Sequence, residues 1–287
     1  MMLAIIVLFA VLGIAYTAVP LVRSGINFVV WKATTNIAYA SGFAENGNTR
    51  IFYESYGDGT PLVLLHGGLS SNLDWIGEIP TLSQNFRLVL INLRGHGRST
   101  LGDEPFTYRL LASDVLAVFD ELHIERANIV GWSDGGNTGL LFAINYPTRI
   151  RRLVAISANY HPEGIVEGVF EMITNAPEKI DPLPNRWMHR LLSGRPEQWA
   201  ELRQRVIEMW HGYPLLSPAE LADVHAPTLV MIGADDDVEL QHSRSMAAAI
   251  AGAELLVIPD VGHAVPRDAP EAVVTNVERF LRGDDDR

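Results

Sequence analysis

Three residues that could together activate a nucleophile occur in the chain order Ser133, Asp236 and His263. Ser133 is the central residue of Gly131-Trp132-Ser133-Asp134-Gly135, which fits the pattern G-x-S-x-G. A serine hydroxyl is a weak nucleophile at neutral pH, so it needs a base within hydrogen-bond reach and a third group that orients the base. The sequence therefore predicts attack of Ser133 on a carbonyl carbon, with His263 as base and Asp236 as its partner.

Each of the three residues follows a short apolar run. These runs comprise residues 129–130, 229–232 and 255–258. In an open α/β sheet the carboxyl ends of parallel strands meet at one edge, and the order Ser, Asp, His is the one that G-x-S-x-G hydrolases use. Asp235 and Asp237 are competing carboxylates in the same cluster, and the register relative to Gly233 favours Asp236.

Acyl transfer also requires hydrogen-bond donors for the oxyanion that forms during the reaction. His66, Gly67 and Gly68 directly follow an apolar run at residues 62–65, where they provide a flexible turn. Gly68 and Asp134 are the predicted oxyanion donors, each through its backbone N–H. His66 is interpreted as structural, because the loop needs backbone geometry more than an imidazole.

The elements that must position these residues are indicated by six short apolar runs. The runs lie at residues 62–65, 88–91, 129–130, 153–156, 229–232 and 255–258. They are apolar throughout, which is typical of strands covered on both faces, and helix-like stretches separate them. This alternation predicts an α/β fold whose mostly parallel sheet is flanked by helices. The core is assigned to residues 47–158 and 219–282.

The alternation is interrupted at residues 159–218, where no strand-like run occurs. Apolar residues recur there at helical spacing, at Trp199, Leu202, Val206, Met209 and Trp210. We interpret the segment as a small helical lid. Its apolar stripe either lines a substrate pocket or packs the lid onto the body, and the sequence leaves both possibilities open.

The N-terminal residues 2–22 contain no charged side chain, and about twenty apolar residues suffice for a helix to cross ~30 Å of hydrocarbon. A membrane anchor within residues 1–23 is the leading interpretation. A cleaved signal peptide, leaving a secreted protein, and a buried core helix are the alternatives. The apolar part of a signal peptide is usually ~7 to 15 residues long after a basic region, which fits poorly. Arg23 and Lys32 leave the side of the membrane open.

The remaining segments and the composition narrow the class of protein. Residues 24–46 are interpreted as a linker, and residues 283–287 as a solvated acidic tail. A formal net charge of -12 argues against nucleic acid as a partner. The absence of cysteine excludes disulfides and cysteine-ligated metals. No nucleotide-binding or zinc-protease motif occurs, so we expect neither a cofactor nor a metal.

Four motifs resemble those of the α/β-hydrolase superfamily: HGG from His66, LRGHGRS from Leu93, GWSDGG from Gly131 and GHAVP from Gly262. The resemblance covers roughly residue 47 to the C-terminus and implies an eight-stranded sheet with a helical lid inserted after the sixth strand. GWSDGG is also similar to the branch of valacyclovir-type amino-acid-ester hydrolases and bacterial carboxylesterases. The sequence departs from its relatives at Asn92, where Asp is common, and Arg94 is expected to anchor the following loop.

The motifs predict a serine hydrolase that cleaves carboxylic ester or related acyl bonds of small molecules through an acyl-enzyme. A serine at position 133 argues against the aspartate-dependent dehalogenases and epoxide hydrolases of the superfamily. Lactone opening, C–C bond hydrolysis and cofactor-free perhydrolysis are alternatives that use the same triad. A non-catalytic binding protein is a further alternative, although it would be expected to lack a triad member and none is missing.

Overall fold

The computed structural model describes residues 20–181 and 183–282. Most of the apolar segment at residues 2–22 and the whole acidic tail at 283–287 therefore lie outside the described residues. Among the described helices, none is long and apolar enough to cross a bilayer.

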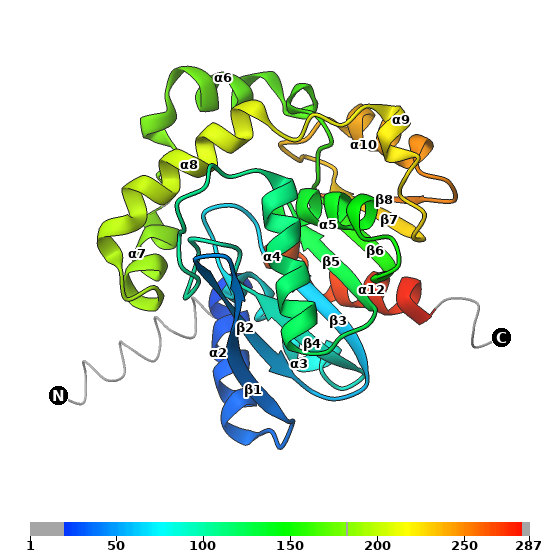
Figure 1. Ribbon diagram of the computed structural model, residues 1–287. Coiled ribbons are helices and arrows are strands. Elements are labelled where there is room, and N and C mark those ends of the chain that lie inside the picture. Colours follow the sequence, from blue (N-terminus) through cyan, green and yellow to red (C-terminus); the bar gives the residue numbers. More distant parts are fainter. Residues whose placement is uncertain (1–19, 182, 283–287) are drawn as a thin grey trace, which may run out of the picture.

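Eight strands form one sheet in the order β1-β2-β4-β3-β5-β6-β7-β8 (Figure 1). The strands are β1 (Tyr39–Asn46), β2 (Thr49–Tyr56), β3 (Thr60–Leu65), β4 (Phe86–Ile91), β5 (Ala127–Trp132), β6 (Ile150–Ile156), β7 (Thr228–Gly233) and β8 (Glu254–Ile258). β2 pairs antiparallel with β1 and β4, and every other neighbouring pair is parallel. The six apolar runs all lie in β3 to β8, and the predicted mostly parallel sheet is confirmed.

Helices cover both faces of the sheet, and the central strands are therefore buried on both sides. α4 (Tyr108–Glu121), α5 (Asp134–Asn145) and α10 (Leu240–Ala249) contribute to one cluster of buried side chains. α3 (Ile79–Leu82), α11 (Val265–Asp268) and α12 (Pro270–Arg282) contribute to the cluster on the other face. Along β3, Val63 and Leu65 face the first cluster while Leu62 and Leu64 face the second. This alternation explains why the strand is apolar at every position.

The prediction of a linker at residues 24–46 is wrong. This stretch holds most of helix α2 (Pro20–Thr34) and the whole of strand β1. The Nζ of Lys32 donates to the hydroxyl of Tyr56 at 3.1 Å and lies 4.5 Å from the ring centroid of Tyr39. These contacts fix α2 against the edge of the sheet. β1 was not predicted because it is an edge strand, and few of its residues are buried.

The segment between β6 and β7 forms a helical insertion over the carboxyl edge of the sheet (Figure 1). Its main helices are α6 (Glu167–Asn175), α7 (Leu183–Leu192) and α8 (Trp199–Gly212), and the short α9 (Pro218–Leu221) follows. Trp199, Leu202, Val206 and Met209 of α8 are buried in the core. The apolar stripe of α8 therefore serves mainly to pack the insertion onto the body.

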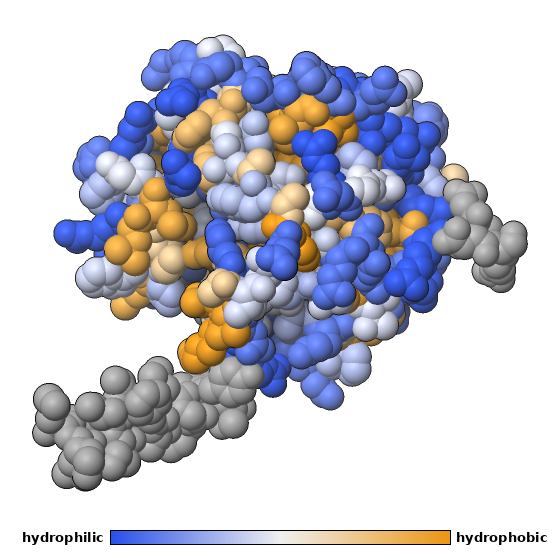
Figure 2. All heavy atoms as spheres, turned by 90° about the horizontal axis from the view of Figure 1, so that it is seen from below, coloured by the Kyte–Doolittle hydropathy of each residue, from blue (hydrophilic) through white to orange (hydrophobic). Residues whose placement is uncertain are grey.

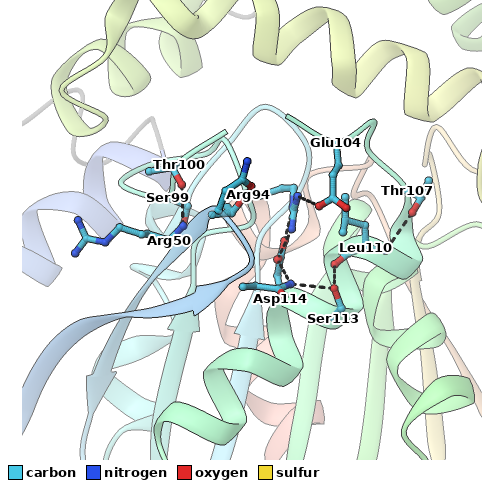
Figure 3. Close-up of polar contacts among 12 residues, drawn as sticks. Arg50, Arg94, Ser99, Thr100, Glu104, Thr107, Leu110, Ser113 and Asp114 are labelled. Atoms are coloured by element: carbon cyan, nitrogen blue, oxygen red, sulfur yellow. Dashed lines mark hydrogen bonds and ion pairs between the residues drawn. The ribbon is translucent and has the colours of Figure 1, made fainter. Parts of the chain in front are cut away.

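A buried ion pair fixes the loop that follows β4, beneath the insertion (Figure 3). Arg94 donates to both carboxylate oxygens of Asp114 on α4, at 2.6 Å each, and to Glu104 at 3.2 Å. Asn46 of β1 donates to Asp114 at 2.8 Å. Arg94 and Asp114 are fully buried, so loss of either would leave an uncompensated charge. Arg94 anchors this loop, as the sequence indicates.

Candidate active site

Ser133 lies at the sharp turn between β5 and α5, where its backbone adopts φ 53° and ψ -118°. Such a conformation costs about 1 to 3 kcal/mol for a residue with a side chain. The turn is possible because the residues two positions before and after the serine are glycines: a Cβ on Gly131 would clash with the carbonyl oxygen of Gly135, and one on Gly135 would clash with the carbonyl oxygen of Leu65. The turn holds the Ser133 side chain at the sheet edge.

The structure brings Ser133, His263 and Asp236 into one hydrogen-bonded chain. His263 Nε2 lies 3.0 Å from Ser133 Oγ, and His263 Nδ1 lies 2.7 Å from Asp236 Oδ1. Asp236 belongs to the loop after β7 and His263 to the loop after β8. Nδ1 carries the proton that the carboxylate accepts, which leaves Nε2 free to accept the proton of the serine hydroxyl.

His263 and Asp236 each stabilise the charged form of the other. Burial disfavours the imidazolium of His263, but the hydrogen bond and charge of Asp236 outweigh burial and raise the pKa of His263 above 6.5. Burial likewise disfavours the Asp236 carboxylate, and hydrogen bonds from His263, Ser157 and the Val238 N–H nevertheless lower the pKa of Asp236. The aspartate is therefore ionised at neutral pH, next to an imidazole that readily accepts a proton.

Asp236 is held by more than the histidine. Ser157 donates its hydroxyl to Asp236 Oδ2 at 2.5 Å, and the N–H of Val238 donates to Oδ1 at 3.1 Å. Among the described carboxylates, Asp236 is the one hydrogen-bonded to His263, and the competing Asp237 instead lines the adjacent cavity. Ser157 was not among the predicted site residues, although it directly follows β6 at the carboxyl edge, a position that could have identified it.

The predicted oxyanion donors lie where their N–H groups are available. The N–H groups on either side of Gly68 are used, because Gly67 donates to Asp74 and Leu69 donates to His96. In the described part of the chain, no acceptor is found for the N–H of Gly68. Asp134 is the first residue of α5, and the first N–H groups of a helix have no partner within it.

The side chain of Asp134 forms a second polar cluster beside the nucleophile, and this cluster was not predicted from the sequence. Its Oδ1 accepts from the hydroxyl of Tyr108 at 2.7 Å and from the indole Nε1 of Trp210 at 2.8 Å. Its Oδ2 is buried without a hydrogen-bond partner among the described residues. Burial raises the pKa of Asp134 to about 6, against these two hydrogen bonds. Because Trp210 belongs to α8, this carboxylate connects the insertion to the nucleophile turn.

Trp132 holds the histidine loop in place. Its indole Nε1 donates to the backbone carbonyl of His263 at 2.7 Å, and its ring lies 5.7 Å from the imidazole centroid. Arg267 lies 5.1 Å from the Trp132 ring and also donates to Asp74. The motif residue before the serine therefore positions the base, a role that its place in the sequence does not reveal.

A cavity of about 220 Å³ opens beside Ser133 and His263. Its apolar lining comes mostly from the insertion and comprises Ile165, Val169, Met172, Ile173, Ile180, Trp210 and Val238. Its polar lining includes Asp134 and Asp237, and no Lys or Arg is among the described lining residues. Within residues 20–181 and 183–282, no group of three or more His, Cys, Asp or Glu is placed to hold a metal ion. The arrangement can accommodate a small apolar acyl group next to the serine.

Curated proteins with similar sequences are hydrolases of several kinds. The chain is 32% identical over 248 residues to RutD of Caulobacter sp. (strain K31), which is named for carbamate hydrolysis, covering 77% of this chain and 91% of that protein. It is 26% identical over 290 residues to carboxylesterase YbfK of Bacillus subtilis (strain 168), covering 91% of this chain and 96% of that protein.

A solved structure agrees with these matches. The enol-lactonase from Burkholderia xenovorans LB400 superposes with a TM-score of 0.67 at 26% identity, covering 84% of this chain and all of that one. The alpha/beta hydrolase family matches residues 62–276, which include Ser133, Asp236 and His263. The chain therefore belongs to the alpha/beta hydrolase family.

Proposed function

We propose that the protein is a serine hydrolase that cleaves carboxylic esters of small molecules through an acyl-enzyme. The observation that carries this proposal is the 3.0 Å contact between His263 Nε2 and the Oγ of a serine held at a strained turn. A half-buried histidine in contact with both a hydroxyl and a carboxylate has the geometry of general-base activation.

In this mechanism Ser133 Oγ attacks the ester carbonyl carbon and transfers its proton to His263 Nε2. The tetrahedral intermediate carries a negative oxygen, which accepts hydrogen bonds from the N–H groups of Gly68 and Asp134. The imidazolium, stabilised by Asp236, returns its proton to the departing alcohol oxygen as the C–O bond breaks. Water, deprotonated by the same Nε2, then attacks the acyl-enzyme, and the acid is released when the proton returns to Ser133.

The cavity supports a preference in the acyl group. Its apolar lining favours an aliphatic or aromatic acyl chain, and the carboxylates of Asp134 and Asp237 disfavour an acyl chain that carries a negative charge. A lactone is a cyclic ester opened by the same steps, and the enol-lactonase among the similar structures supports testing such substrates as well.

Membrane association through residues 2–22 is part of the proposal, because this run is uncharged and long enough to insert in a bilayer. Cleavage of the run, leaving a secreted enzyme, is the competing outcome. The mass of the protein recovered after expression of the full chain distinguishes the two, since it includes residues 2–22 only if the run is uncleaved.

Activation of the serine is tested with a fluorophosphonate probe, which reacts with nucleophilic serines and not with ordinary hydroxyls. We expect one covalent adduct, located at Ser133 by peptide mass spectrometry, and none in Ser133→Ala or in heat-denatured protein. The matched control Ser41→Ala removes an exposed hydroxyl of β1 and should label like the wild type. Absence of labelling in folded wild-type protein would contradict the proposed function.

The charge preference predicts a difference between two esters of similar size. At pH 8 we expect p-nitrophenyl pentanoate to have a kcat/KM about 10- to 100-fold higher than mono-p-nitrophenyl glutarate, since like charges 6 Å apart repel by roughly 3 kcal/mol at an effective dielectric constant of 20. The pKa of Asp134 is about 6, so this carboxyl is mostly protonated at pH 5 and the ratio should shrink there.

Asp134→Asn should reduce the discrimination at pH 8 while keeping the backbone N–H at this position. Asp237→Asn serves as the comparison, because this carboxylate is exposed and its charge is better screened by solvent. Equal turnover of the two esters by the wild type at pH 8 would refute the preference without bearing on the role of Ser133.

A further inference from the structure

The insertion carries an apolar stripe that faces away from the body. Leu183, Trp187 and Leu191 follow each other at intervals of four residues along α7, and their exposed fractions are 56%, 59% and 71%. Helical residues four apart lie on the same face. The other face of α7 is packed, as shown by the buried His189. A stripe of large apolar side chains left in water is unfavourable and marks an interaction surface.

Helix α2 carries a second stripe of the same kind. Ile26, Val29 and Val30 have exposed fractions of 37%, 66% and 57%. Their spacing of three and four residues places them on one face, while Phe28 and Trp31 pack toward Tyr56 on the sheet. The exposed residues are therefore not needed to attach α2 to the body.

The two stripes belong to neighbouring helices. A cavity of about 290 Å³ is lined by Phe28 and Lys32 of α2 together with Leu192 of α7. Leu73 and Ile76 line this cavity and also the next one, which extends under α7. Viewed from below, apolar surface gathers on the left side of the molecule, the side on which α7 lies (Figures 1 and 2). We call the six exposed residues Ile26, Val29, Val30, Leu183, Trp187 and Leu191 the α2–α7 surface.

The charges of these helices differ from those of the whole chain. The chain has 34 acidic and 22 basic residues, yet neither α2 nor α7 contains an Asp or Glu. Each helix carries two cations, Arg23 and Lys32 on α2 and Arg186 and Arg190 on α7. Arg23 and Arg186 are paired with Glu271 and Asp181, whereas Lys32 and Arg190 form no ion pair within the described residues. Apolar side chains beside cations, with a tryptophan among them, are typical of helices that lie at a lipid interface, where anionic headgroups attract the basic residues.

The position of α2 in the chain favours lipid as what covers this surface. The described chain begins at Pro20, and the uncharged run of residues 2–22 ends within the first turn of α2. Ile26 is therefore four residues beyond the run. If the run inserts in a bilayer, as proposed above, the α2 stripe lies at the lipid surface and α7 lies beside it.

We propose that the α2–α7 surface docks the folded domain onto a lipid bilayer, with its apolar side chains below the headgroups. This inference rests on the proposed membrane association of residues 2–22 but assigns a separate surface. Interfacial helices bury their apolar face about 5 to 10 Å into the boundary between headgroups and acyl chains. Leu191 and Val29, the two most exposed residues of the surface, should therefore contact lipid directly.

The absence of cysteine in the chain makes single-site labelling straightforward. Leu191→Cys and Val29→Cys in the full chain would each be labelled with an environment-sensitive fluorophore and reconstituted into vesicles of neutral and anionic phosphatidyl lipids. Ala251→Cys, at an exposed position in the turn before β8, is the matched control. The measurement is quenching by lipids that carry a spin label just below the headgroup.

We expect at least about twofold quenching at positions 191 and 29, consistent with interfacial burial, and none at position 251. Resistance of the vesicle-bound protein to extraction at high pH reports separately whether residues 2–22 are inserted, because a protein docked only through its surface is released. Labels that stay accessible to an aqueous quencher in protein that resists extraction would overturn the docking and leave the anchor intact. Labels shielded from water but not quenched by lipid would also overturn it, because protein, either residues 1–19 or a second copy, would then cover the surface.

Discussion

Replacement of Ser133 by alanine is expected to lower kcat toward a neutral p-nitrophenyl ester by about 10⁶-fold, as loss of the nucleophile does in triad hydrolases. The reaction loses its covalent intermediate, and the oxyanion donors and the cavity alone supply a residual acceleration of about 10³ to 10⁴ over water. Alanine keeps the Cβ and hence the strain at φ 53°, so the free energy of unfolding should change little. Steady-state kinetics and thermal unfolding check both expectations.

The triad should also behave as one unit. His263→Ala is expected to lower kcat about as much as Ser133→Ala, and the double variant should be no slower than either single variant, because each change already removes the covalent route. Ser41→Ala provides the matched serine control. Multiplicative losses in the double variant, or near-normal turnover by Ser133→Ala, would exclude the mechanism.

Replacement of Asp236 by asparagine is expected to lower kcat by about 10⁴-fold, because an amide can hold the imidazole in the tautomer with its proton on Nε2. The pH profile supplies a second readout. Wild-type kcat/KM should fall as pH decreases through the pKa of His263, which Asp236 raises above 6.5. Without the carboxylate, burial of the imidazole remains and lowers the pKa of His263, so the acidic limb should move to lower pH.

The matched control for this change is Asp235→Asn, one residue earlier on the same loop. The side chain of Asp235 is exposed, and its backbone N–H donates to the carbonyl oxygen of Val261, a bond that the substitution leaves in place. This variant should retain the wild-type kcat and pH profile. A larger loss in Asp235→Asn than in Asp236→Asn, or an unshifted acidic limb in Asp236→Asn, would show that Asp236 does not orient His263.

The sequence predicted the strands in which burial on both faces determines the residue type at every position. β3 to β8 are apolar because helices cover both faces, and this composition is visible without any partner. The contact between Ser133 and His263 followed from the rule that parallel strands end at one edge. In both cases the pattern behind the prediction spans only a few residues, because each strand is an apolar run and each catalytic residue closely follows one.

What the sequence did not predict depends on contacts between distant segments. Tyr108, Asp134 and Trp210 form a cluster from α4, α5 and α8, and no local pattern marks them as partners. β1 and α2 were missed for a related reason. Their packing depends on the aromatic contacts around Lys32 and Tyr56, whereas apolar periodicity in the segment is weak.

Because α2 and β1 occupy the residues predicted to be a linker, the N-terminal segment is joined to the domain by folded structure. A flexible linker of about 23 residues would have a root-mean-square end-to-end distance of roughly 24 to 29 Å and would transmit no torque. Helix α2, which begins at Pro20, instead contacts the sheet through the hydrogen bond from Lys32 to Tyr56. If residues 2–22 insert in a bilayer, as proposed, the membrane segment leads directly into a helix packed on the sheet, and this attachment restricts how the cavity is oriented relative to the lipid surface.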